Sequence, residues 1–189
     1  MEVCQTVFEG RPQDGAGRCP QELACYDCLD RLGISYLRVD HEHADTIEAC
    51  HAVEAVLGTA ICKNLFLCNR QKTAFYLLMM EGEKVFKTKE LSKQLGVSRL
   101  SFADAADMKR LLDLEPGSVS ILGLLNDREH SVQLVMDRPI YEGERVGCHP
   151  CRNTSTLSVR TKDLLERFLP DVGHSVICVD LPEEPEITE

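Results

Sequence analysis

The sequence predicts an α+β fold in which helices pack on one mixed, mostly antiparallel sheet. Segments with helical periodicity and segments with strand-like alternation are interspersed along the chain, without the strict alternation of a parallel α/β fold. No Pro/Gly/Ser-rich linker divides the middle of the chain, and 189 residues are enough for one sizeable core. We therefore expect a single domain over residues 20–181, preceded by a loose leader over 1–19 and followed by an acidic tail over 182–189.

The first half of the chain predicts two helices and three strands. Pro20 suits the first turn of a helix, because its missing N–H would have no partner there. Apolar residues then recur every three positions from Leu23 to Leu32, and Gly33 ends the pattern. The remaining expected elements are a strand at residues 35–39, a helix capped at Asp45 and ended at Gly58, and two buried strands at 61–67 and 73–80.

The second half predicts shorter helices and three more strands. Gly96 ends a short helix over residues 90–95, and a further helical stretch begins at Phe102. Pro116 and Gly117 predict a turn. The other expected elements are strands at residues 131–136, 154–159 and 175–179, and a helix over 162–169 that Thr161 caps and Pro170 stops.

The charge balance limits the possible partners. The chain has 31 acidic and 21 basic residues, hence a formal net charge of -10. Such a protein does not bind long duplex DNA through its overall field. The segment from Lys84 to Arg110 is different, with seven basic and three acidic residues. It predicts either a local surface for nucleic-acid phosphates or a solvated helix face.

The ten cysteines predict reduced thiols in a cytoplasmic protein. The N-terminus has no basic stretch followed by an apolar run, as a secretory signal would, and no apolar run approaches the length of a membrane span. Two Cys-x-x-Cys pairs lie at residues 25–28 and 148–151, much too far apart for an ordinary zinc ribbon. A thiol or metal module at Cys148 and Cys151 stays open, beside the simpler interpretation that these thiols fill the core.

The histidines after the first expected strand provide a weaker metal hypothesis. His41, His43 and His51 could be drawn as a cluster, but the spacing gives no third ligand at a fixed position. A solvated loop before a capped helix is the alternative. We expect no metal and no cofactor.

Three short segments carry more specific chemistry. Lys63 stands inside the apolar run 61–67, where it is either a strand-end lysine or a cation facing a cleft. Residues 116–120 form a small-residue turn whose backbone N–H groups can approach a ligand. Residues 149–156 gather a histidine, an asparagine and several hydroxyls before a strand.

In this order, the three segments resemble the prolyl-tRNA editing family, the YbaK/ProX-type aminoacyl-tRNA deacylases akin to the editing insertion of bacterial prolyl-tRNA synthetase. The resemblance runs from about Tyr26 to Leu181 and is strongest to the ProX branch. The matching stretches are residues 63–67, 99–103, 116–120 and 125–127, with His149-Pro150, Asn153-Thr154 and Thr156.

The resemblance implies a domain of the YbaK/prolyl-tRNA synthetase-associated type that hydrolyses mischarged tRNA(Pro), with alanyl-tRNA(Pro) as the expected substrate. The partner is then the acceptor end of the tRNA, with prolyl-tRNA synthetase as a candidate second partner and neither a membrane nor DNA involved. By position, the catalytic residues it implies are Lys63, Gly117 and His149, and the substrate-binding residues are Asn64, Ser118, Val119, Asn153, Thr154 and Thr156.

One position departs from the family pattern. The loop that begins at Gly117 ends in proline in the family, whereas this chain has Ile121. Isoleucine restores an N–H and frees the backbone angle that proline would set. Two further alternatives therefore stay open: a deacylase for another amino acid such as cysteine, and a non-catalytic tRNA-binding or regulatory relative.

Overall fold

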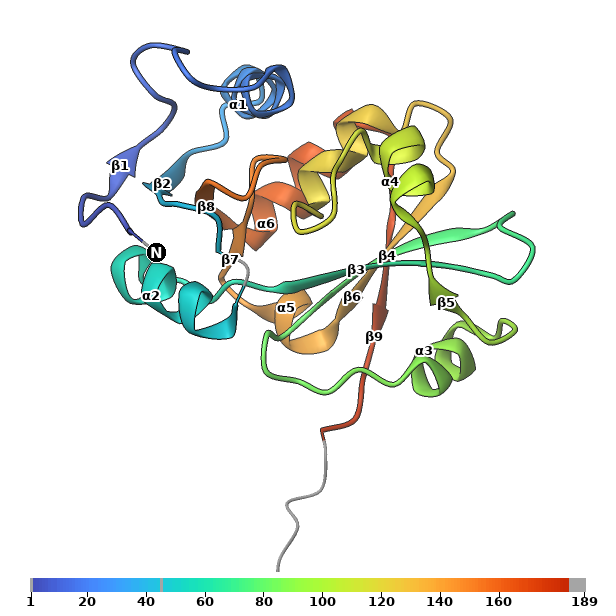
Figure 1. Ribbon diagram of the computed structural model, residues 1–189. Coiled ribbons are helices and arrows are strands. Elements are labelled where there is room, and N and C mark those ends of the chain that lie inside the picture. Colours follow the sequence, from blue (N-terminus) through green and yellow to red (C-terminus); the bar gives the residue numbers. More distant parts are fainter. Residues whose placement is uncertain (1, 45, 184–189) are drawn as a thin grey trace, which may run out of the picture.

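The computed structural model describes residues 2–44 and 46–183, and its strands form two sheets (Figure 1). The first sheet is antiparallel throughout. Its strands, in spatial order, are β1 (Phe8–Glu9), β2 (Tyr36–Asp40), β8 (Ser155–Arg160) and β7 (Arg145–Cys148). The predicted α+β class is confirmed, but the strands divide into two sheets where one was expected.

The second sheet is mixed. Its order is β5 (Ser101–Phe102), β3 (Lys63–Cys68), β4 (Phe75–Met80), β6 (Val132–Asp137) and β9 (Val176–Val179). The pairs β5–β3 and β3–β4 are antiparallel, whereas β4–β6 and β6–β9 are parallel. The β3–β4 pair is antiparallel because a short connection joins its strands, and the parallel pairs need the helical crossovers between their strands.

The two sheets join where Ile61 and Gly147 form an isolated parallel bridge. The backbones approach so closely there that a Cβ on Gly147 would lie 2.6 Å from the carbonyl oxygen of Ala60. Only glycine fits at this position, so the junction depends on one residue with no side chain.

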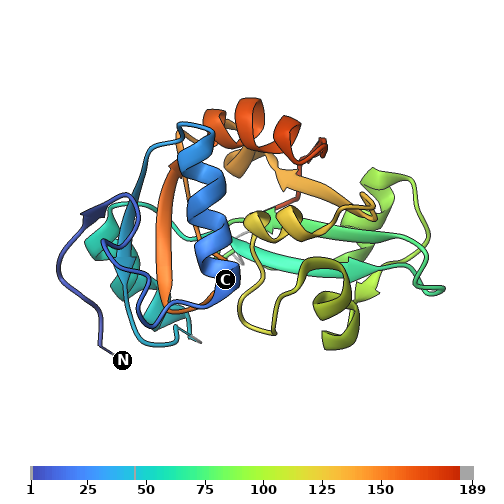
Figure 2. The same cartoon turned by 90° about the horizontal axis from the view of Figure 1, so that it is seen from above.

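Helices cover both sheets (Figure 2). The longer ones are α1 (Pro20–Arg31), α2 (Ile47–Leu57), α3 (Thr88–Leu95) and α4 (Ala105–Leu112), and the shorter ones are α5 (Arg138–Glu142) and the 3-10 helix η1 (Ile121–Asn126). The main core lies between the sheets and includes Tyr26 of α1, Leu111 of α4, Phe66 of β3 and Phe168. A second cluster packs α3 against the other face of the mixed sheet, and a third packs α2 on β2.

Several helix starts differ from the prediction: α3 begins at Thr88, and Thr161, the predicted cap of the last helix, is its first residue, with Arg160 at the cap position. Phe102 belongs to the edge strand β5, and α4 begins only at Ala105, because the carboxylate of Asp104 accepts a hydrogen bond from the backbone of Asp107 and caps the helix there. In α2 the cap is Thr46, whose hydroxyl accepts from the backbone of Ala49. The predicted cap, residue 45, lies outside the described residues.

Pro170 does not stop the last helix. The helical run comprises α6 (Thr161–Asp163), the π-helical turn η2 (Leu164–Phe168) and α7 (Leu169–Asp171). In the wide turn, the N–H of Leu169 bonds to the carbonyl of Leu164. A widened turn of this kind accommodates the proline ring, which would clash in a regular α-helix.

Part of the segment predicted as a leader pairs with the first sheet. Val3 forms a bridge with His41, β1 adds a strand beside β2, and the guanidinium of Arg38 lies 4.7 Å from the centre of the Phe8 ring. Residues 184–189 of the expected acidic tail lie outside the described residues. Within the described chain, no helix is both long and apolar enough to cross a membrane.

Candidate functional site

The three segments singled out in the sequence meet at the junction of the two sheets. Gly147 accepts a hydrogen bond from the N–H of Cys62, just before β3, and donates one to the carbonyl of Ala60. The hydroxyl of Ser120 donates to the backbone carbonyl of His149 at 2.6 Å. The start of β3, the loop before η1 and the turn after β7 are thus tied together by hydrogen bonds.

His149 is buried with one ring nitrogen fixed. Its Nδ1 lies 3.0 Å from the carbonyl oxygen of Ser155. A carbonyl only accepts hydrogen bonds, so Nδ1 carries the proton and Nε2 is left with an acceptor lone pair. No described residue lies within hydrogen-bonding distance of Nε2. Burial lowers the pKa of His149 to about 4, so the ring is neutral at physiological pH.

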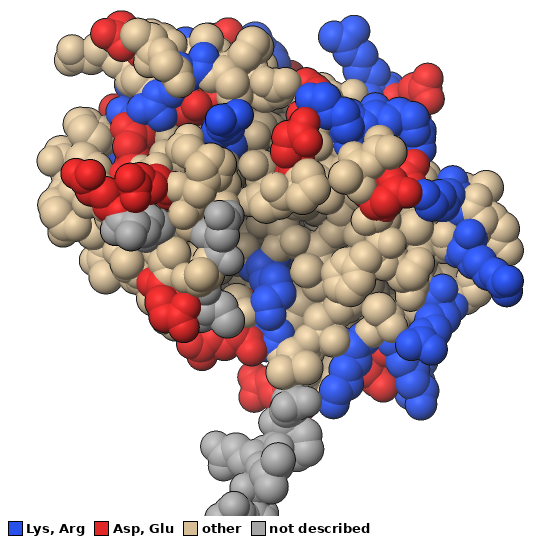
Figure 3. All heavy atoms as spheres, viewed as in Figure 1, with Lys and Arg blue, Asp and Glu red and all other residues tan. Residues whose placement is uncertain are grey.

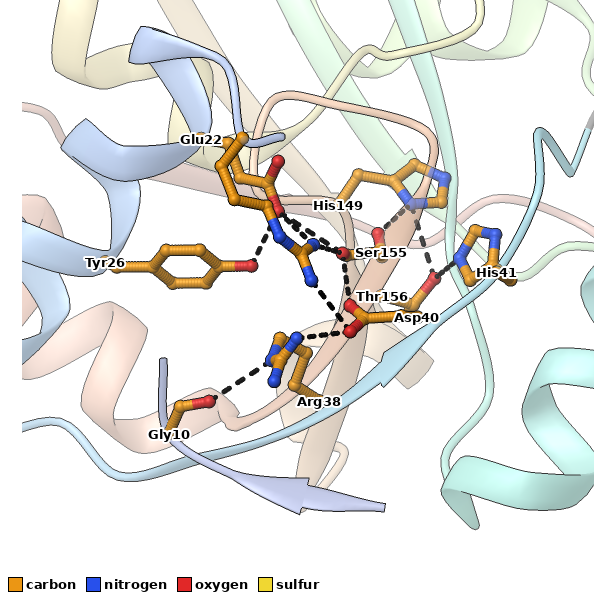
Figure 4. A network of polar contacts seen from close by, with 10 residues as sticks. Gly10, Glu22, Tyr26, Arg38, Asp40, His41, His149, Ser155 and Thr156 are labelled. Carbon is orange, nitrogen blue, oxygen red and sulfur yellow. Dashed lines mark hydrogen bonds and ion pairs between the residues drawn. The ribbon is translucent and has the colours of Figure 1, made fainter. Parts of the chain in front are cut away.

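A second histidine supports this arrangement through Thr156 (Figure 4). His41 donates from Nδ1 to the carbonyl of Glu42, which leaves its Nε2 to accept from the hydroxyl of Thr156 at 2.9 Å. The Thr156 oxygen lies 3.3 Å from Nδ1 of His149 and accepts a second, longer branch of the bond that the Nδ1 proton makes to Ser155. Burial also lowers the pKa of His41. Two neutral histidines are therefore linked through one hydroxyl.

The sequence did not assign His41 this place. The two histidines considered with it do not join it: His51 instead lies 3.3 Å from Glu83, and among the described residues no three His, Cys, Asp or Glu side chains are placed to hold a metal ion. The sequence signal for His41 was its place directly after an expected strand. That this strand pairs with β8, and so brings His41 to Thr156, is seen only in the structure.

Asn153 fixes the segment that leads to α2. Its amide donates to the carbonyl of Ala44 at 3.2 Å and accepts from the N–H of Ala44 at 3.3 Å. The backbone carbonyl of Thr154 accepts a hydrogen bond from the N–H of His41. Thr154 also lines a cavity of about 510 Å³ together with Arg18 and Arg152. These two predicted residues thus lie in the same region as His149 and Thr156.

Lys63 and Asn64 project from opposite faces of β3, since neighbouring side chains in a strand alternate. The ammonium of Lys63 donates to the backbone carbonyl of Lys84 at 2.9 Å. The amide of Asn64 donates to the carbonyl of Cys62. Lys63 therefore contacts the 81–87 segment, and the structure does not bring its ammonium to His149.

The loop before η1 has the shape expected of a tight turn. Gly117 has a φ of +85°, a conformation that favours glycine, and the N–H of the buried Ser118 donates to the carbonyl of Glu115. Val119 packs partly buried against the main core. Ile121, where the family has proline, is fully buried and begins η1, so it serves as a core residue here.

A charged network behind His149 holds the strand that carries its partners. The hydroxyl of Ser155 donates to Asp40 at 2.7 Å, and Arg18 bridges Glu22 and Asp40 at 2.7 Å each (Figure 4). Burial opposes ionisation of Asp40, but hydrogen bonds from Arg18 and Ser155 outweigh it and lower the pKa of this carboxyl. No local sequence pattern indicated this network, because Arg18 lies in the expected leader.

The cysteines near the site are buried and are poor nucleophiles. Burial raises the pKa of Cys62 to about 12 and that of Cys148 well above its usual value. The Sγ atoms of Cys151 and Cys25 lie 3.3 Å apart. Thiols with such pKa values stay protonated at neutral pH, so they fill the core rather than react.

Several of the basic side chains in segment 84–110 are buried or paired with acidic residues, so they are not free to bind phosphates. The side chain of Lys84 is 6% exposed and bonds to the fully buried Asp137 at 2.7 Å. Lys109 and Arg110 pair with acidic neighbours on or next to α4. Figure 3 shows the face of the molecule seen in Figure 1. Basic side chains gather on its right, over α3 and β5, and there is a hollow near its centre.

The fold and the site define an α+β domain with a polar site, rich in histidine, threonine and amide groups, at the junction of two sheets. Comparison with protein families matches residues 41–166 to the aminoacyl-tRNA editing domain. The chain belongs to this family.

Known relatives agree with this assignment. The chain is 30% identical over 153 residues to the prolyl-tRNA editing protein ProX of Acetoanaerobium sticklandii, covering 81% of this chain and 93% of ProX. It is 34% identical over 168 residues to the prolyl-tRNA synthetase associated domain-containing protein 1 of Xenopus laevis, covering 87% and 98%. The solved structure of a candidate trans-editing enzyme for prolyl-tRNA synthetase has the same fold, with a TM-score of 0.64, 14% identity and coverage of 87% and 99%.

Proposed function

We propose that the protein is an aminoacyl-tRNA deacylase that acts in trans, in the cytoplasm, on mischarged tRNA(Pro), with alanyl-tRNA(Pro) as its substrate. Membership of the editing family supports this proposal, as does the similarity to ProX. The observation that carries it is the neutral His149, whose Nδ1 proton is fixed by Ser155 and whose Nε2 is left to accept from a substrate.

In this proposal His149 positions the aminoacyl group. The ammonium group of an aminoacyl ester is a hydrogen-bond donor, and the lone pair on Nε2 is its complement. Thr156 and His41 keep the ring in the required tautomer. Asn153 joins the turn to the segment before α2, and Thr154, which lines a cavity with Arg18 and Arg152, is assigned to the substrate side of this turn.

The loop at residues 117–119 supplies donors to the ester carbonyl as negative charge develops on its oxygen. The N–H of Ser118 already donates to Glu115, which leaves those of Gly117 and Val119, for which the described chain contains no acceptor. One such donor contributes up to about 3 kcal/mol to the transition state. Water is the nucleophile.

Lys63 and Asn64 act at the tRNA end of the ester. The ammonium of Lys63 is bound to a single backbone carbonyl, a contact that a phosphate or ribose oxygen can replace. A charge-assisted bond to the terminal nucleotide is stronger than the bond to a neutral carbonyl that it replaces.

The need for such an enzyme is physical. A synthetase pocket shaped for proline distinguishes a smaller amino acid by only about 1–3 kcal/mol per missing methylene, because the smaller side chain still fits. A second, smaller site hydrolyses what passes the first. Prolyl-tRNA synthetase, whose products the protein would correct, is the proposed protein partner.

The test is hydrolysis of alanyl-, cysteinyl- and prolyl-tRNA(Pro) by the wild type and by Lys63→Ala. We expect release of alanine, little release of proline, and a loss of about 100-fold in kcat/KM in the variant. Lys162→Ala, which removes an exposed lysine that pairs with Glu166, is the matched control and should retain full activity.

The outcomes separate the alternatives. Faster hydrolysis of cysteinyl-tRNA would reassign the amino acid. Binding of tRNA with no turnover of any substrate would contradict the deacylase and favour a non-catalytic relative. Equal activity of the wild type and Lys63→Ala would remove Lys63 from the mechanism.

A further inference from the structure

Phe102 is an unusual surface residue. It is 62% exposed, the most exposed of the large hydrophobic side chains in the described chain. It lies on β5, a two-residue strand at the edge of the mixed sheet. An exposed aromatic ring at a sheet edge offers a planar face on which another ring can stack.

The sheet places Phe102 on the same face as Lys63. Phe102 pairs with Leu67 across the antiparallel β5–β3 ladder, so the two side chains project to one side. Lys63 lies four residues before Leu67 on β3 and, with a period of two, shares that side. At about 3.3 Å per residue, the distance along the strand from Lys63 to the level of Phe102 is about 13 Å.

A second ring orients Phe102. Phe86 meets it at a centroid distance of 6.1 Å and an interplanar angle of 72°, an edge-to-face contact. Such contacts stabilise a ring by about 0.5–1.5 kcal/mol and restrict its rotation. Because Phe102 remains 62% exposed, the contact holds the ring without covering it.

Basic residues are concentrated in the segment that carries these two rings. Between residues 85 and 103 the chain has four basic residues and one acidic residue, in a protein whose net charge is -10. Lys89, Lys93 and Arg99 are exposed and form no ion pair with any described residue. Figure 3 shows this concentration of basic side chains over α3 and β5.

We propose that this surface, Phe102 and Phe86 with Lys89, Lys93 and Arg99, binds the unpaired nucleotides at the 3′ end of the tRNA. Phe102 stacks on a base, and the cations contact the adjoining phosphates. Exposed aromatic rings beside cations are the usual arrangement for single-stranded nucleic acid. The identity of the RNA rests on the proposed function; the preference for a single-stranded end rests on the rings and charges.

The experiment measures binding without chemistry. Uncharged tRNA(Pro) and the same tRNA lacking its four 3′-terminal nucleotides are titrated by fluorescence anisotropy with the wild type, Phe102→Ala and Phe102→Trp. We expect Phe102→Ala to weaken binding of the intact tRNA by about 5- to 100-fold, as loss of one stacked base does, and to leave the truncated tRNA unaffected. Phe102→Trp should bind like the wild type.

Two further variants provide a control and a test of the charges. Tyr141→Ala removes another exposed aromatic side chain, on α5, and should not change binding. The double variant Lys89→Ala/Lys93→Ala should lower the slope of log K against log salt concentration by about 1.4, which is two phosphate contacts on a single strand.

The proposal is overturned if Phe102→Ala binds intact tRNA as tightly as the wild type, or if it weakens both tRNAs equally. The readout does not depend on turnover. A wild type that prefers the intact 3′ end but hydrolyses no ester would contradict the proposed function and leave this surface standing.

Discussion

Nδ1 of His149 lies 3.0 Å from the carbonyl oxygen of Ser155, and this contact determines which ring nitrogen carries the proton. His149→Asn keeps a donor near Nδ1 and removes Nε2, whereas His149→Gln keeps a polar group near Nε2 and removes the donor. We expect His149→Asn to fold normally and lose about 100-fold in kcat/KM, the scale of one lost transition-state contact. Circular dichroism and deacylation kinetics check this. Full activity in His149→Asn would show that Nε2 is not used.

Thr156 should act as a positioning residue. Thr156→Val has the same shape but cannot donate to His41 or accept from His149, so a buried polar group loses its partner at a cost of about 1–3 kcal/mol. We expect lower stability in urea and at least about tenfold lower kcat/KM, with both restored in Thr156→Ser. A serine variant no better than valine would contradict the role of the hydroxyl.

Ser120 connects the loop to the histidine turn. Its hydroxyl donates to the carbonyl of His149 and accepts from the N–H of Leu122. Ser120→Ala loses both bonds, and we expect the free energy of unfolding to fall by about 1–2 kcal/mol. Chemical denaturation measures this. The matched control is Ser98→Ala, an exposed serine whose removal should change stability by less than about 0.5 kcal/mol.

The depressed pKa of His149 predicts a pH-dependent stability. Above pH 6.5 the ring is neutral in both states and contributes nothing. As the pH falls from 6.5 toward about 4, the unfolded chain binds a proton that the native state does not, so the native state loses stability, on the order of 3 kcal/mol in total. Denaturation of the wild type and His149→Asn from pH 7 to pH 4 isolates this loss. A stability difference that stays constant over this range would refute it.

Lys84 should matter for stability rather than for tRNA. Its ammonium neutralises the fully buried carboxylate of Asp137. Lys84→Met leaves that charge uncompensated, and we expect a loss of about 3–5 kcal/mol in the free energy of unfolding. Lys89→Met, on exposed α3, should have the wild-type stability. Thermal and urea denaturation distinguish the two, and equal stability of both variants would show that the buried pair is not needed.

Local patterns in the sequence determined most of the secondary structure. Pro20 begins α1, and Gly58 and Gly96 end α2 and α3 in left-handed conformations, as their positions predicted. Such signals act within a single helical turn, so no distant contact is needed to interpret them. The order of the three site segments likewise identified the family.

Only the tertiary structure decided the pairing, the burial and the protonation at the site. His41 and Thr156 are 115 residues apart in sequence, and their hydrogen bond exists only because β2 pairs with β8. Phe102 became a strand residue because β3 offered it an edge, and Lys84 was removed from the basic surface by Asp137. The sequence by itself indicated the family and the three segments that meet at the candidate site. The fold decided which of their atoms face one another, because pKa values and hydrogen bonds depend on distances that no local pattern encodes.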